Sequence, residues 1–246
     1  MTISMEDAAR RIVISKAEDV EEHLKHSNIG LTVITGRSLD DINYGTVPTL
    51  VVHLPENGPD AADDEFEEFS DFIQQDINRI IEFLETNPTR NILIHCSAGM
   101  HRSPNYALFL LLNLQGEKRD FFAAMAAVHK IRPLADLSEI FYYRPYLGLS
   151  QKKCEKLIVD YSLAKRIRNR INDGDNFQDA FNNVARLLRP RPTLKHAKKV
   201  FRKIGFEYPK DTAPCDAGND QPTHTPSSPH KPASRAGQHM GRGGPS

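Results

Sequence analysis

A cysteine, an arginine and a serine lie close together between two apolar stretches of the sequence. The segment ILIHCSAGMHRSPNYALFL (residues 92–110) places Cys96 directly after one apolar run, and Arg102 and Ser103 directly before the next. Five residues between Cys96 and Arg102 are enough for the chain to curve around one tetrahedral anion. The arginine side chain can hold two oxygens of that anion at once. The spacing therefore favours a thiolate nucleophile that acts on a phosphate group.

The neighbouring residues have the properties that such a loop needs. Backbone N–H groups of a loop before a helix converge on an anion, small residues let the backbone approach it closely, and the positive field there lowers the pKa of a thiol. We expect Cys96 to be the nucleophile, Arg102 the clamp and Ser103 the hydrogen-bond partner of the thiolate. We expect His95 to fix the position of the cysteine through its ring nitrogen. The expected phosphate-binding residues are Ser97, Ala98, Gly99, Met100, His101 and Arg102.

Strands and helices must position this loop, and hydrophobic periodicity predicts both. Short apolar runs predict strands, which are residues 11–15, 31–35, 47–54 and 91–95. Apolar residues at three- and four-residue steps predict helices, which are residues 16–26, 66–84, 104–114, 119–131 and 138–146. Ser103 is predicted to cap the helix that starts at Pro104.

The alternation of strands and helices predicts an α/β domain over residues 8–150. Its single, mostly parallel, twisted sheet would be flanked by helices. Cys96 would then lie at the carboxyl edge of the sheet, which is where open α/β folds bind their ligands.

At these residues the sequence resembles a known family. His95-Cys96, five further residues and Arg102-Ser103 are similar to the signature of cysteine-dependent protein tyrosine phosphatases, and the Ser-Pro after the arginine is similar to their dual-specificity branch. The first strand, helix and strand, together with Arg132-Pro133, extend the resemblance over residues 8–150. It implies a protein-tyrosine-phosphatase-like fold and hydrolysis through a cysteinyl-phosphate, with no cofactor and no metal ion.

The resemblance also implies an aspartate roughly thirty residues before the cysteine, which protonates the leaving oxygen and later activates water. The segment GPDAADDEF offers Asp60, Asp63 and Asp64. Alignment of the following helical stripe favours Asp64, with Asp63 next to it. Asp60 becomes the better choice if the long helix already starts at Asp63, because the acid belongs on a loop. A helix N-cap or first-turn carboxylate is the alternative role for each of them.

His101 departs from the dual-specificity pattern, which usually has a small residue directly before the arginine. Two interpretations of this histidine stay open. Its side chain either faces solvent, or it borders the pocket and adds positive charge for an acidic substrate when it is protonated.

Charge is balanced overall, with 32 basic and 32 acidic residues, but it is unevenly distributed. Residues 56–85 hold eleven acidic residues and one arginine, whereas residues 165–203 hold twelve basic and three acidic residues. Helical patterns at 151–172, 175–188 and 194–203 make residues 151–206 a basic helical extension. Residues 165–203 are a candidate surface for an acidic partner, a nucleic acid or an anionic membrane. The alternative is a solvated helical face that balances the acidic helix.

The composition of the C-terminal tail, the number of cysteines and the length of the apolar stretches indicate where the protein is located and which part of it is disordered. Residues 207–246 hold seven of the sixteen prolines and five of the fourteen glycines, which predicts a disordered tail. Three cysteines do not make a disulfide framework. No stretch has the apolar length of a signal peptide or a membrane helix. We therefore expect a cytoplasmic protein, with a nuclear location as the alternative, and the sequence leaves its oligomeric state open.

The function that these observations favour is dephosphorylation of phosphotyrosine and of phosphoserine or phosphothreonine in proteins. Three alternatives share the same loop. The basic extension suits an RNA 5′-phosphatase. A phosphoinositide phosphatase is the second alternative, although such enzymes often carry lysines in the loop and SAGMH has none. The third alternative is a catalytically weak module that binds phosphorylated proteins, which applies if none of the aspartates reaches the loop.

Overall fold

Within the described part of the chain, four parallel strands form a sheet in the order β1-β4-β2-β3. The computed structural model describes residues 3–36, 42–52, 63–117, 119–138 and 149–207, and for residues 63–71 it describes the backbone alone. The predicted α/β class with a mostly parallel sheet is confirmed. The strands are β1 (Ile12–Lys16), β2 (Ile29–Thr35), β3 (Thr49–Val52) and β4 (Asn91–Cys96).

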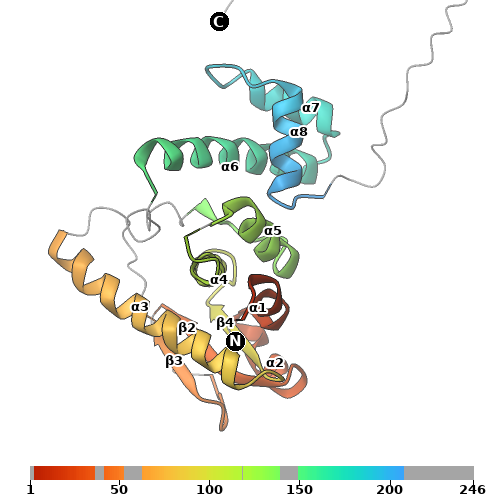
Figure 1. The fold of residues 1–246 in the computed structure, drawn as a ribbon. Coiled ribbons are helices and arrows are strands. Elements are labelled where there is room, and N and C mark those ends of the chain that lie inside the picture. The colour runs from red at the N-terminus through yellow and green to blue at the C-terminus, as the bar shows by residue number, and fades with distance from the viewer. Residues whose placement is uncertain (1–2, 37–41, 53–62, 118, 139–148, 208–246) are drawn as a thin grey trace, which may run out of the picture. The chain divides into compact units, whose positions relative to one another are not determined.

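Helices cover both faces of this sheet (Figure 1). One face packs on α1 (Met5–Arg11), α3 (Asp63–Thr86), α4 (Arg102–Leu114) and α5 (Phe121–Ile131). The other face packs on α2 (Val20–His26), which follows the short 3₁₀ turn η1 (Ala17–Asp19). Side chains alternate along β4, so Ile92 and Ile94 point into the larger core and Leu93 points toward α2.

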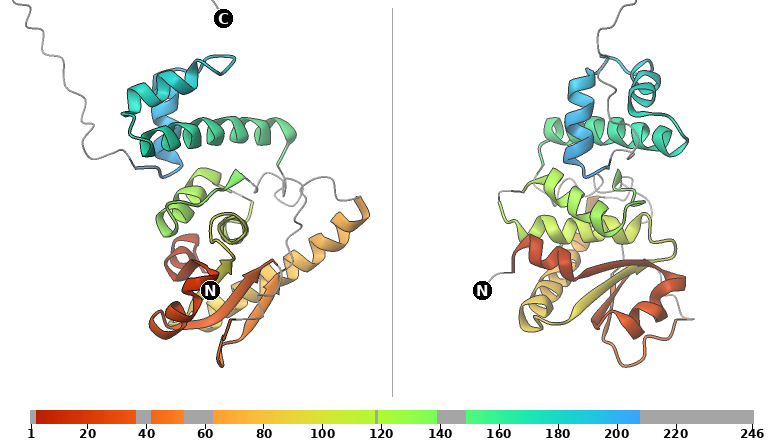
Figure 2. Two further views of the ribbon diagram at one scale, coloured as in Figure 1. Left: turned by 180° about the vertical axis from the view of Figure 1, so that it is seen from behind. Right: turned by 90° about the vertical axis from the view of Figure 1, so that its right-hand side faces the viewer.

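Three further helices make up the extension: α6 (Gln151–Asn172), α7 (Phe177–Ala185) and α8 (Leu194–Lys203). Ser150 and Thr193 cap α6 and α8, since their hydroxyls accept hydrogen bonds from the N–H groups of Lys153 and His196. The three helices share an apolar core, and α8 contacts α5. Both views of Figure 2 show one end of α8 beside α5. Residues 1–212 form one compact unit, so the extension belongs to the same unit as the α/β part.

The structure differs from the sequence analysis at two helices. Ser103 does not cap α4, because the helix already begins at Arg102 with His101 in the cap position, and the Ser103 hydroxyl lies at the cysteine instead. Helix α1 was missed because Ala8 is its one buried residue, which leaves no apolar stripe to detect. The helix predicted for 138–146 and the tail predicted for 207–246 lie, apart from one residue each, outside the described residues. None of the helices in the described ranges is long and apolar enough to cross a membrane.

Candidate active site

Cys96 is the last residue of β4, which lies between β1 and β2 in the sheet. It pairs with Lys16 at the end of β1, and its neighbour His95 pairs with Ile34 near the end of β2. The buried Thr35 hydroxyl donates a hydrogen bond of 3.0 Å to the His95 carbonyl. The cysteine is thus presented at the carboxyl edge of the sheet, as the sequence predicted, and its strand is held on both sides.

The loop between β4 and α4 has its carbonyl groups tied to the surrounding structure. Each of four carbonyl oxygens accepts a hydrogen bond from a residue outside residues 97–101. Ser97 O accepts from Ala17 N (3.0 Å), Gly99 O from Arg132 Nε (3.2 Å), Met100 O from Asp136 N (2.8 Å), and His101 O from Asn105 N (3.1 Å) and Nδ2 (2.8 Å).

This arrangement fixes where the N–H groups of the loop point. A trans peptide directs its C=O and the following N–H to opposite sides, and these peptide bonds are all trans. Outward carbonyls therefore place the following N–H groups on the inner side of the loop, while the Gly99 N–H donates to Cys96 Sγ at 3.3 Å. The inward donors are those of Ala98, Gly99, Met100, His101 and Arg102. The loop is a cradle of N–H groups around the cysteine sulfur, which suits an anion.

The Cys96 side chain is 4% exposed and lies among groups that stabilise its thiolate. Burial acts to raise the pKa of the thiol. The Ser103 hydroxyl 3.3 Å from the sulfur, the Ser103 and Gly99 N–H groups and the Arg102 charge outweigh this effect, so the pKa of Cys96 is lowered from its ordinary value. The predicted role of Ser103 as partner of the thiolate agrees with this geometry.

The lowered pKa gives a testable pH dependence. Only the thiolate reacts with iodoacetamide, so alkylation of folded Cys96 should persist below the pH at which an unperturbed thiol (pKa about 8.5) becomes protonated. The rate should fall only as the pH drops through the lower, folded value. Alkylation of the tryptic peptide of residues 91–102, followed by mass spectrometry, measures this midpoint. The same peptide alkylated in guanidinium is the control, and equal midpoints would contradict the prediction.

The Arg102 side chain lies against Gly36, the residue directly after β2. A Cβ atom on Gly36 would lie 2.1 Å from Arg102 Nη1, and the glycine has a φ of +123°, which other residues rarely adopt. Its N–H donates to Val52 O at 3.0 Å, which fixes it at the end of β3. Gly36 is therefore part of the surface that positions the arginine. The sequence showed it only as a strand-ending glycine.

Gly99 makes a second close approach, on the β1 side of the loop. Its φ is +65°, and a Cβ atom added to it would lie 2.7 Å from both the carbonyl carbon and the carbonyl oxygen of Ser15. A side chain at this position would push the loop away from the sheet edge. The central glycine of the loop is thus required by both its conformation and its packing.

His95 does not have the contact that we predicted for it. Neighbouring residues of a strand point to opposite faces, so its ring lies on the α2 side of the sheet, away from the Cys96 side chain. Its Nε2 lies 3.1 Å from the Tyr44 hydroxyl, and among the described residues its Nδ1 has no hydrogen-bond partner. Burial lowers the pKa of His95 to about 4, so the ring is neutral near pH 7. We conclude that the backbone of β4, rather than this ring, positions Cys96.

His101 has a side chain that is 51% exposed, and its Nδ1 lies 3.8 Å from the carboxylate of Asp136. This ion-pair geometry turns the ring toward a carboxylate of the protein itself. Of the two interpretations that the sequence left open, the solvent-facing one fits this arrangement.

Two of the three candidate acids, Asp63 and Asp64, fall at the start of α3. The helix begins at Asp63, so the backbones of Asp63 and Asp64 belong to its first turn, and Asp60 lies outside the described residues. Under the criterion given above, a helix that starts here favours Asp60 over Asp64. The identity of the acid stays a prediction.

Several positions that shape the loop were missed in the sequence. Thr35 and Asp136 gave no signal, because their partners lie far away along the chain. Asn105 could have been found, because an amide inside an apolar helix needs buried partners, and its Nδ2 donates to the His101 and Asp136 carbonyls. Within the described ranges, no three His, Cys, Asp or Glu residues are grouped so as to hold a metal ion.

Comparison with known proteins finds likeness in solved structures alone. No protein-family model and no curated protein matches the chain. Human DUSP28 is 17% identical with a TM-score of 0.45, over 60% of this chain and 90% of its own. A leucine-rich-repeat and phosphatase-domain protein of Entamoeba histolytica is 21% identical with a TM-score of 0.41, over 64% and 92%. OH1 from the Orf virus, described as a tyrosine phosphatase, is 17% identical with a TM-score of 0.40, over 56% and 80%.

These structures are of the kind that the sequence resembles, namely phosphatases. At such low identities and TM-scores they add nothing about the chemistry of this chain. The case for its function depends on the geometry of the loop.

Proposed function

We propose that this protein hydrolyses phosphomonoesters through a cysteinyl-phosphate intermediate. The observation that carries the proposal is the cradle of five inward N–H groups around a cysteine whose pKa is lowered, with Arg102 at its rim against Gly36. Such a cradle stabilises the negative charge on the equatorial oxygens of a phosphoryl group in transfer. No metal ion is needed in this scheme, because the amides and the arginine supply the positive potential.

The reaction proceeds in two displacements. In the first, the Cys96 thiolate attacks phosphorus, the bond to the leaving oxygen breaks, and an aspartic acid gives that oxygen its proton. In the second, the same aspartate takes a proton from water, the resulting hydroxide attacks phosphorus, and the S–P bond breaks. Inorganic phosphate leaves, and the Ser103 hydroxyl stabilises the departing thiolate from 3.3 Å.

The proposed substrates are phosphotyrosine and phosphoserine or phosphothreonine in proteins, and the proposed location is cytoplasmic or nuclear. The absence of lysine in SAGMH argues against phosphoinositides. RNA with a 5′-phosphate group is the second candidate substrate, because five basic residues on one side of α8 line a groove together with Leu194. These residues are Lys195, Lys198, Lys199, Arg202 and Lys203.

The surroundings of the α8 groove distinguish between the partners that the basic extension could bind. The apolar side of α8 is buried, with Ala197, Val200 and Phe201 no more than 3% exposed, so this helix has no apolar face to insert into a membrane. An acidic protein surface or a nucleic-acid backbone fits the groove better. Relative rates on a phosphotyrosine peptide, a phosphothreonine peptide and an RNA with a 5′-triphosphate decide between these substrates.

Hydrolysis of para-nitrophenyl phosphate in EDTA tests the proposed function. Wild type should turn over and Cys96→Ser should not, and acid quenching should leave phosphate on the tryptic peptide of residues 91–102. If both proteins hydrolyse the ester equally slowly, the proposal is wrong.

The general acid is identified by three substitutions. We expect Asp60→Asn to lower kcat by about a hundredfold on phenyl phosphate, and by much less on para-nitrophenyl phosphate, whose leaving group needs little protonation. Asp63→Asn and Asp64→Asn serve as matched controls within the same segment, with kcat close to wild type. A large loss at Asp64 would restore the alignment-based choice. Wild-type rates in all three variants would favour the phosphoprotein-binding module.

A further inference from the structure

The segment of residues 132–137, called the support segment below, contacts the loop between β4 and α4 at several points. This loop, residues 97–101, is called the phosphate loop below. Arg132 Nε donates to the Gly99 carbonyl at 3.2 Å, and the Asp136 N–H donates to the Met100 carbonyl at 2.8 Å. The Asp136 carboxylate also lies 3.8 Å from His101 Nδ1. These bonds hold two of the four outward carbonyls, and hence help to orient the N–H groups on the inner side.

The support segment is in turn held by helix α6 of the extension. Three side chains that share one side of this helix reach it. Tyr161 Oη accepts the Leu137 N–H at 2.7 Å, Lys165 Nζ lies 2.5 Å from Asp136 Oδ2, and Arg168 Nη1 donates to the Pro133 carbonyl at 2.8 Å. Tyr161 is 1% exposed, and the Asp136 carboxylate is 14% exposed, so the contacts with Leu137 and Asp136 are largely shielded from water.

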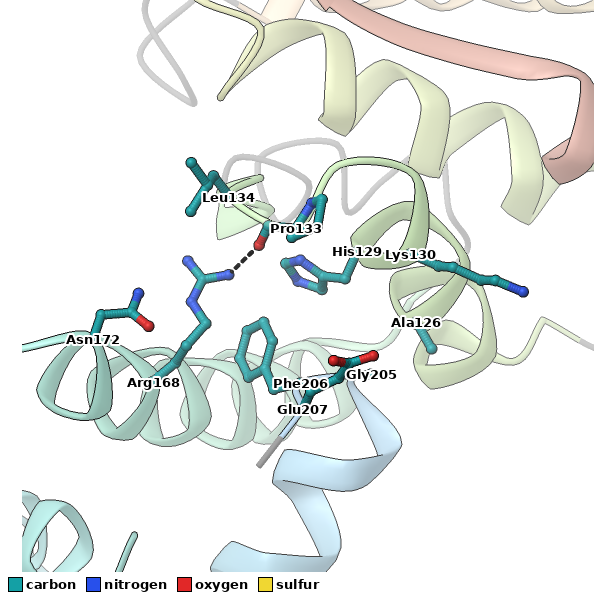
Figure 3. Close-up of a pocket in the computed structure, with 10 residues that line it drawn as sticks. All are labelled: Ala126, His129, Lys130, Pro133, Leu134, Arg168, Asn172, Gly205, Phe206 and Glu207. Carbon is teal, nitrogen blue, oxygen red and sulfur yellow. Dashed lines mark hydrogen bonds between the residues drawn. The ribbon is translucent and has the colours of Figure 1, made fainter. Parts of the chain in front are cut away.

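Hydrogen bonds matter here because side-chain packing is incomplete beside the segment. A cavity of about 480 Å³ lies between α5, the support segment and α6. Figure 3 shows Arg168 extending past Phe206 to the Pro133 carbonyl at this cavity, and the guanidinium lies 4.5 Å from the centre of the Phe206 ring. Apolar contacts do not fix Pro133 and Leu134 on the cavity side, so the bonds from α6 help to determine where the segment lies, together with the buried Ala135 and Leu137 and the Asn105 bond to the Asp136 carbonyl.

We propose that helix α6 holds the phosphate loop in its anion-binding shape through the support segment, with Tyr161, Lys165 and Arg168 as positioning residues. This inference rests on the proposed function, because it concerns the same loop. It assigns the extension a part in catalysis, separate from any partner that its basic surface binds. None of the three residues touches the phosphate, and each acts through the side chains or the backbone of the support segment.

Loss of a contact between α6 and the support segment should change the shape of the phosphate loop rather than unfold the protein. If Asp136 loses Lys165, the carboxylate and its backbone can shift, and the Met100 carbonyl loses its fixed donor. The following N–H of His101 then no longer points steadily into the cradle. A displaced donor stabilises both the Cys96 thiolate and the transferring phosphoryl group less well, and a shift on the order of 1 Å can cost up to about a hundredfold in rate.

The decisive variant is Lys165→Met in the full-length chain, with Lys156→Met, an exposed position of the same helix, as the matched control. Lys165→Met should raise the midpoint pH of Cys96 alkylation and lower kcat/KM on para-nitrophenyl phosphate by about tenfold. Lys165→Arg, which keeps the cation, should restore most of both values. Lys156→Met should match wild type. Tyr161→Phe removes one oxygen and little volume, and it should shift the midpoint in the same direction.

The outcomes separate the two proposals. Wild-type midpoints and kcat/KM in both Lys165→Met and Tyr161→Phe overturn the positioning role. A lower Tm with an unchanged midpoint shows a merely structural role and overturns it as well. If Lys165→Met does not fold, the Tyr161→Phe midpoint decides. If wild type turns over no faster than Cys96→Ser, the proposed function fails, whereas the alkylation midpoints still test the positioning role.

Discussion

A Cys96→Ser variant is expected to lose hydrolysis of para-nitrophenyl phosphate by about four orders of magnitude or more. The groups around the sulfur stabilise a thiolate: Ser103 Oγ and the Gly99 N–H each lie 3.3 Å from it. A serine hydroxyl in the same place stays protonated at neutral pH, because its pKa lies far above that of a thiol. Initial rates in EDTA, measured beside the Tm of each protein, check this expectation.

The matched control is Cys154→Ala, since Cys154 is the other buried cysteine of the described residues and lies on α6. Its activity should stay within about twofold of wild type, as a packing change remote from the reacting atoms. Equal losses in the two variants would mean that Cys96 contributes to packing rather than to chemistry. The serine variant keeps Arg102 and the inward N–H groups, so it should still bind phosphorylated proteins. Material captured from a lysate by Cys96→Ser, and not by wild type, would then identify substrates.

A Gly36→Ala variant is expected to lower kcat/KM by about a thousandfold, although residue 36 has no side chain that could take part in the reaction. The added Cβ would lie 2.1 Å from Arg102 Nη1 and 2.9 Å from Cζ, so the guanidinium must leave its place. The displaced arginine can then no longer offer two parallel donors to the phosphate oxygens. Because the φ of +123° is unfavourable for alanine, the free energy of unfolding should also fall, by about 1–3 kcal/mol.

The control for this variant is Gly116→Ala, which also replaces a glycine of positive φ (+60°) but has no atom within 4 Å of the new Cβ. It should lose about 1 kcal/mol of stability and keep its kcat/KM. Inhibition by inorganic phosphate separates the two effects, since Gly36→Ala should bind phosphate more weakly and Gly116→Ala should not. Full activity of Gly36→Ala would show that Arg102 does not need this contact.

Local sequence was sufficient to predict the proposed chemistry of the loop and most of the helices and strands around it. The apolar run before Cys96, the small residues after it and the arginine six positions on are all contained in one short segment. Hydrophobic periodicity therefore predicted β4, α4 and the parallel sheet that presents the cysteine. It missed the start of α4, because the same serine suits a cap and a buried partner of a thiolate, and only the position of Cys96 Sγ decides between them.

What holds the loop in shape was decided by tertiary structure. Gly36 meets Arg102 across 66 positions of sequence, Thr35 meets His95, and Lys165 reaches the loop only through Asp136. Each of these residues is of a type that is common on surfaces or at strand ends, so their contacts cannot be predicted from spacing along the chain. The sequence alone determined which atoms we propose to react, because those groups are neighbours along the chain. Only the fold determined which residues orient those groups, because the supporting contacts join segments that become neighbours when the sheet and the extension pack together.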